Sequence, residues 1–169
     1  VEKNTTNKIE GLNVEDKSSN EGNISYDILF KVRYPGEEGK YIGMYIDLEL
    51  QGDRYPGYPL EMRGVYYAAR LLGSELTKID RHTNYSELQK VYSIFIVMGN
   101  NVPVAERGTA TLYEMRKTDI IGSVEVPESW YDLINVIMIR IHDEMESTDE
   151  TLNILKAVCS GLLSKQEKL

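Results

Sequence analysis

Two runs of alternating side chains, separated by a short turn, constrain this chain more than any other feature. Apolar residues occupy every second position of residues 26–34, and again of residues 41–51. A period of two is typical of a β-strand. The connection, residues 35–39, reads Pro-Gly-Glu-Glu-Gly, which is the composition of a turn. We therefore predict an antiparallel hairpin over residues 26–51.

The periodicity changes after the hairpin. Residues 60–76 carry an apolar stripe at approximately helical spacing, and Pro59 is well placed near the start of a helix. Residues 91–98, VYSIFIVM, are almost continuously apolar, which indicates a strand buried on both faces. A helix between two neighbouring strands is the right-handed crossover of a parallel pair. We therefore predict an α/β fold with a mixed sheet.

The remaining segments predict further elements of the same fold. We expect strands at residues 109–115, 120–126 and 131–141, and a last helix over residues 150–164 that is capped by Thr148 and Asp149. Residues 1–24 lack sustained periodicity and indicate an irregular lead-in. We expect one domain over residues 1–169 and, because the first residue is Val1, a piece of a longer protein.

Composition limits the function classes. The net charge of −8 weighs against a protein that coats nucleic acid, since phosphate binding depends on lysine and arginine. No apolar run approaches the roughly 20 residues of a membrane span, so we expect no membrane partner. The single cysteine, Cys159, lies in an apolar helical pattern, and we expect a small core residue and a cytoplasmic protein.

The acidic residues of the hairpin are candidates for a metal-binding catalytic site. Asp27 lies near the start of the first strand, while Glu49 and Gln51 lie two residues apart near the end of the second and share one face. In an antiparallel hairpin such positions can meet, and two carboxylates that converge repel each other unless a cation lies between them. Mg²⁺ prefers such oxygen ligands. The alternative is a solvent-exposed strand face on which acidic residues need no function.

A series of short motifs carries a resemblance to a known family. They are, in order, GLNVEDK (11–17), NEG (20–22), YDI (26–28), IDLELQ (46–51), YPGYPL (55–60), RGVYYAAR (63–70) and KVYSI (90–94). This series resembles the bacterial PD-(D/E)xK nuclease family transposases, relatives of the recombination-promoting nucleases. The resemblance covers residues 9–98 and continues more vaguely to about residue 142.

The resemblance implies a fold and a reaction. It implies a restriction-endonuclease-like core: a mixed sheet with a hairpin that carries the acidic site, a crossover helix and flanking helices. It implies a metal-dependent DNA endonuclease, linked to mobile elements or recombination, that uses Mg²⁺ or Mn²⁺. Asp27 matches the first metal-binding acid, Glu49 the second, and Glu21 an upstream helper ligand. Gln51 stands where the superfamily has a lysine, and Tyr26 replaces the proline that names the motif.

DNA contacts are expected beside the acids. Arg63 and Arg70 lie seven residues apart on one helical face and can contact phosphates, as can Lys31; an exposed helix face or a solvated strand is the alternative. Tyrosines at positions 55, 58, 66 and 67 can stack on bases or pack against the sheet. Paired cuts in this class imply two active sites and hence a homodimer.

Two other functions stay open. One is a weak or inactive nuclease-fold protein that binds DNA or a protein partner, which the neutral Gln51 and the net acidity favour. The other is a carboxylate-pair hydrolase of a non-nucleic substrate, which no motif supports. A requirement for a divalent metal ion would distinguish the nuclease from the carboxylate-pair hydrolase.

Overall fold

The computed structural model describes residues 8–18, 22–35, 41–78 and 84–166. Strands and helices follow in the order β1 (Lys8–Gly11), β2 (Glu15–Ser18), β3 (Gly22–Ser25), β4 (Ile28–Pro35), β5 (Tyr41–Gln51), α1 (Leu60–Lys78), β6 (Lys90–Met98), β7 (Thr109–Tyr113), β8 (Ile134–Ile141) and α2 (Glu150–Gln166). Three short 3₁₀ turns are η2 (Tyr85–Glu87), η3 (Val104–Glu106) and η4 (Glu128–Trp130). The chain is thus an α/β protein, as its periodicities predict.

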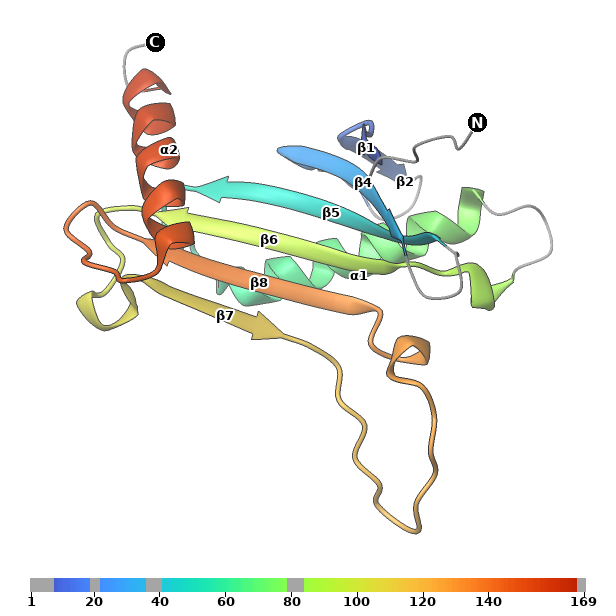
Figure 1. Cartoon of the computed structure of the whole chain (residues 1–169). Coiled ribbons are helices and arrows are strands. Elements are labelled where there is room, and N and C mark those ends of the chain that lie inside the picture. The colour runs from blue at the N-terminus through green and yellow to red at the C-terminus, as the bar shows by residue number, and fades with distance from the viewer. Residues whose placement is uncertain (1–7, 19–21, 36–40, 79–83, 167–169) are drawn as a thin grey trace, which may run out of the picture.

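A six-stranded mixed sheet, in the order β1-β4-β5-β6-β8-β7, forms the centre of the fold (Figure 1). The predicted hairpin is present, because β4 and β5 pair antiparallel with Ile28 opposite Leu48. Next, β5 pairs parallel with β6, and β6 pairs parallel with β8, while β7 returns antiparallel along the edge. The helix α1 makes the crossover from β5 to β6, as expected for a parallel pair.

Helices cover opposite faces of this sheet. Side chains at alternate positions of β6 and β8, including Phe95, Val136 and Met138, pack with Leu60 and Ala68 of α1. On the other face, α2 covers the end where β5 and β6 finish (Figure 1), and its Cys159 is buried there beside Ile96 and Ile141. None of the described helices combines the length and the apolar character needed to cross a membrane.

Three predictions were wrong in their detail. The expected irregular lead-in contains β1, which pairs with β4, and the β2–β3 hairpin. The expected strand at residues 120–126 is absent: the segment is irregular, with Ile120 and Ile121 almost fully exposed. Ile and Val favour strands only where a neighbouring strand and a packed face receive them. Finally, β4 begins at Ile28, so that Asp27 precedes the strand.

Candidate functional site

Acidic side chains of β5 lie beneath α1. Asp47 and Glu49 point to the sheet face that the helix covers, and both are fully buried. The alternative interpretation, in which these acids lie on a solvent-exposed strand face, is therefore wrong. Because α1 covers one face and α2 the other, both alternating faces of β5 are packed at this end. Only Asp27, on the connection before β4, is exposed.

Asp27 and Glu49 are held side by side by two reciprocal hydrogen bonds. The backbone N–H of Asp27 donates to Glu49 Oε1 at 2.9 Å, and the backbone N–H of Leu50 donates to Asp27 Oδ2 at 3.0 Å. Both bonds follow from the hairpin register, in which the residues after Leu48 continue opposite the residues before Ile28. The Asp27 carboxylate thus reaches solvent, whereas the neighbouring Glu49 carboxylate does not.

Arg63 supplies the positive charge of the site. Its Nη2 donates to Glu49 Oε2 at 2.8 Å, and its Nη1 donates to Gln51 Oε1 at 3.3 Å. The guanidinium stacks over the rings of Tyr67, at 4.8 Å, and Phe95, at 5.6 Å. Burial opposes the charge on Arg63, but Tyr67 and Glu49 outweigh burial and raise the arginine pKa. Both oxygens of Glu49 therefore have partners inside the protein.

Asp47 is a site residue that no motif indicated. Burial raises the pKa of Asp47, the charge of Glu49 adds to the rise and the bond from Ser93 opposes it, so that the pKa lies at about 8. Ser93 Oγ donates to Asp47 Oδ2 at 2.7 Å, whereas Oδ1 is buried and has no donor among the described residues. A proton on Asp47, which burial and the charge of Glu49 both favour, would make this oxygen a donor. The signal was available in the i, i+2 spacing of Asp47 and Glu49.

Glu49 is shielded from water by the same packing. Burial raises the pKa of Glu49 and Asp27 adds to the rise, while the backbone bond from Asp27 and the charge of Arg63 lower it. With Asp47 protonated, as its raised pKa indicates, Asp47, Glu49 and Arg63 together hold one carboxylate and one guanidinium. Such a unit is close to electrically neutral, which is how a buried charge is retained.

The other predicted site residues lie elsewhere or outside the described chain. Arg70 is buried two turns along α1 from Arg63, and its Nη1 donates to Tyr66 Oη at 3.3 Å. Lys31 donates to Tyr45 Oη at 3.1 Å. It lies four residues along β4 from Asp27, or about 13 Å. Glu21, the expected helper ligand, lies outside the described residues. Only Arg63 of the three predicted DNA contacts therefore meets the acids.

Tyrosines around α1 divide into two groups. Tyr67 packs edge-to-face on Tyr26, with ring centroids 5.4 Å apart, and belongs to the core. Tyr55, Tyr58 and Tyr66 are exposed on the loop after β5 and on the outer side of α1. Packing against the sheet is thus observed for Tyr67 alone.

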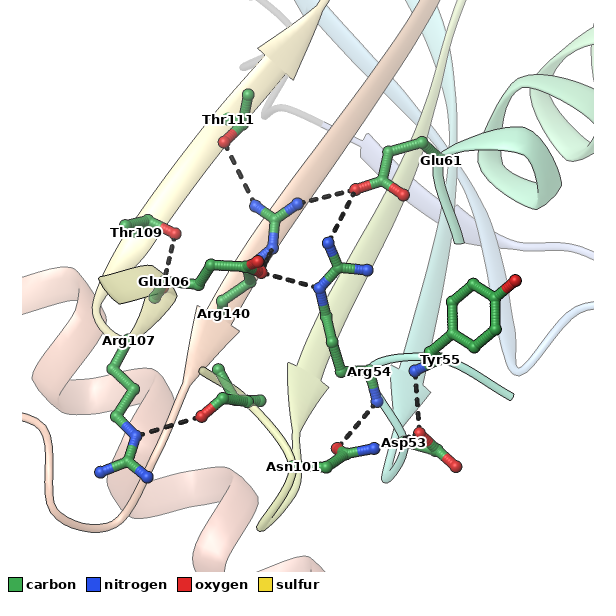
Figure 2. Close-up of polar contacts among 11 residues, drawn as sticks. Asp53, Arg54, Tyr55, Glu61, Asn101, Glu106, Arg107, Thr109, Thr111 and Arg140 are labelled. Atoms are coloured by element: carbon green, nitrogen blue, oxygen red, sulfur yellow. Dashed lines mark hydrogen bonds and ion pairs between the residues drawn. The ribbon is translucent and has the colours of Figure 1, made fainter. Parts of the chain in front are cut away.

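A closed ring of ion pairs fixes the loop that follows Gln51 (Figure 2). Glu106 Oε2 lies 2.7 Å from Arg54 Nε and 2.9 Å from Arg140 Nε. Glu61 Oε1 lies 2.8 Å from Arg140 Nη2 and 3.7 Å from Arg54 Nη2. The bond from Arg54 holds the pKa of Glu106 below its ordinary value. The ring joins the loop, the first turn of α1, η3 and β8 at the end of the sheet where Gln51 lies.

The donor set of the site fits a hard divalent cation. The carboxylate oxygens of Asp27 and Glu49 and the amide oxygen of Gln51 are of the kind that Mg²⁺ and Mn²⁺ prefer. Within the described ranges, no group of three His, Cys, Asp or Glu side chains gathers as a metal cluster. A cation here would rely on two carboxylates and one amide. A scan against protein-family models, a search of curated proteins and a search of solved structures each found no match to this chain.

Proposed function

We propose that this chain is a metal-dependent endonuclease that hydrolyses DNA phosphodiester bonds at the Asp27–Glu49 site. The observation that carries the proposal is the reciprocal pair of hydrogen bonds that holds these two carboxylates together where β5 ends. The hairpin, the crossover helix α1 and the parallel strand β6 supply the arrangement that the resemblance implies, and they support a restriction-endonuclease-like core.

Each residue has a role that follows from its exposure. Asp27 is exposed and is the carboxylate that incoming ligands reach first. Glu49 is buried and keeps a fixed orientation through Asp27 N and Arg63. Gln51 is neutral, so its amide can orient a water or a phosphate oxygen without adding charge. When bound, a Mg²⁺ or Mn²⁺ ion supplies activation of water and neutralisation of the scissile phosphate.

Arg63 is the residue that links substrate to site. Its guanidinium contacts both Glu49 and Gln51, and its ion pair with Glu49 places a positive charge beside the acids. A planar guanidinium matches phosphate geometry as well as carboxylate geometry. If Arg63 transferred its hydrogen bond from Glu49 to a phosphate oxygen of the DNA, the Glu49 carboxylate would be free to hold the cation. Substrate and cation would then bind together.

Plasmid nicking tests the proposal. Supercoiled DNA is incubated with the chain and Mg²⁺, Mn²⁺ or EDTA, beside the variants Asp27→Asn and Glu49→Gln. Glu144→Gln serves as the matched control, because the Glu144 side chain is 75% exposed and pairs only with Arg107 among the contacts described. We expect metal-dependent nicking by the wild type and the control, and none by either site variant. Equal nicking by the Asp27→Asn protein refutes the site.

A second function has its own support. Both Glu49 oxygens are satisfied by Asp27 N and Arg63, so the unit is stable without a cation. This favours an inactive nuclease-fold protein that binds DNA or a protein partner. Binding of Mn²⁺, followed by its paramagnetic resonance, separates the two: a bound cation without nicking supports the inactive protein, and nicking excludes it.

A further inference from the structure

The edge of the sheet at β7 combines two features that point to one kind of partner. No strand within the described part of the chain pairs with the outer side of β7. Its sequence, Thr-Ala-Thr-Leu-Tyr, has no charge and no proline. Soluble proteins usually protect such an edge with lysine, proline or a bulge, since free N–H and C=O groups recruit another strand.

The segment that follows β7 projects away from the sheet (Figure 1). We call residues 114–127 the arm. All of its residues except Glu114 and Val126 are exposed, and Ile120 and Ile121 are 91% and 96% exposed. Its base is nevertheless held, because the buried Asp132 accepts a hydrogen bond from Met115 N at 3.3 Å and pairs with Lys90. Long irregular segments with exposed apolar tips are typical of contact surfaces.

We propose that β7 and the arm form a homodimer interface, in which β7 pairs antiparallel with β7 of a second copy about Thr111. This register places Ala110 of each copy opposite Leu112 of the other. The strand is self-complementary, because an uncharged segment brings no like charges face to face across a twofold axis. The interface does not depend on the proposed nuclease activity.

The exposed apolar surface approaches the size that a dimer requires. Across β7 and the arm, six large apolar side chains are exposed. If each buries on the order of 100 Å², the total is about 600 Å² per copy, which is most of the ~800 Å² per partner of a stable interface. Strand pairing alone falls short of this area, so the arms must cover the second copy. Nucleic acid is a poorer partner, since the arm holds three acidic and two basic residues.

Charge-swapped variants test the interface by sedimentation. The wild type should sediment at twice the 19.3 kDa chain mass at micromolar concentration. Ala110→Lys with Leu112→Lys places lysines opposite each other twice, and should weaken the dimer at least about tenfold. Ala110→Glu with Leu112→Glu should do the same. A mixture of the two variants should restore the dimer mass, because each lysine then faces a glutamate.

Two further variants make the outcome specific. Ile120→Ser with Ile121→Ser should also weaken the dimer, because the arm tip loses its apolar contact. Ile154→Lys with Val158→Lys is the matched control: it charges two exposed positions of α2, and should leave the mass unchanged. Circular dichroism of each monomer verifies the fold. A monomeric wild type, a lysine variant that stays dimeric, or a charge-swapped mixture that stays monomeric overturns the proposal.

Discussion

Gly64 sets how closely α1 approaches the sheet, and its replacement tests the packing above Glu49. A Cβ on Gly64 would lie 2.5 Å from Val136 Cγ1, 3.2 Å from Met138 Cε and 3.4 Å from Phe95 Cε2. The valine is β-branched and stiff at χ1, so it cannot swing away cheaply. Overpacking of a core typically costs about 1–3 kcal/mol. The alanine recovers up to about 1 kcal/mol of helix propensity.

We therefore expect Gly64→Ala to lower the free energy of unfolding by up to about 2 kcal/mol. Gly73, on the same helix, is the matched control, because nothing lies within 4 Å of its Cβ position. Gly73→Ala should raise stability by up to about 1 kcal/mol, or roughly 2–4 °C in Tm for a chain of this size. Thermal and urea unfolding measure both variants. If Gly64→Ala is as stable as Gly73→Ala, the helix does not pack against Val136 as described.

Three further predictions follow from buried groups. Since the pKa of Asp47 is raised from 3.8 to about 8, the folded state holds a proton that the unfolded state releases, and this contribution to stability is lost as the pH rises between those values. The Asp47→Asn variant should lack that pH dependence, and at alkaline pH its free energy of unfolding in urea should exceed that of the wild type by at least about 1 kcal/mol. Parallel pH profiles of the two proteins would contradict this prediction. The Arg140→Met variant should lose about 1–3 kcal/mol of unfolding free energy, because it breaks the ion-pair ring at its buried member. The control Arg107→Met should lose under about 1 kcal/mol, and equal losses would contradict the ring. Burial raises the pKa of the Cys159 thiol, so a thiol reagent should modify it far more slowly in the folded than in the denatured chain, and similar rates would place it at the surface.

The hairpin and the crossover could be predicted because their signals are local. Alternation over residues 26–51, a helical stripe after Pro59 and the continuous apolar run before Gly99 each lie within one segment. The approach of Asp27 to Glu49 also follows from the hairpin alone. The edge strand β7 and the buried strand β8 were predicted for the same reason, apart from shifts at their ends.

The rest depends on tertiary packing. Alternation divides β5 into two faces, but it does not say which face α1 covers, and so the burial of Asp47 and Glu49 could not be predicted. The pairing of Arg63 with Glu49 depends on the rotation of the helix about its axis. The ion-pair ring has no local pattern, because its members come from four separate segments. The expected strand at residues 120–126 had the composition of a strand, but no strand of the described segments lies beside it to pair with.

The ion-pair ring has a consequence for local unfolding. Each charged group has two opposite neighbours, so no segment can leave the ring without exposing a partner that is half-buried or buried. The loop after β5, the first turn of α1, η3 and the end of β8 should therefore open together, as one cooperative unit. Segments that are distant in the chain then share a single opening free energy. The loop after Gln51 should therefore exchange its amide hydrogens as slowly as the end of β8, which the ring joins to it.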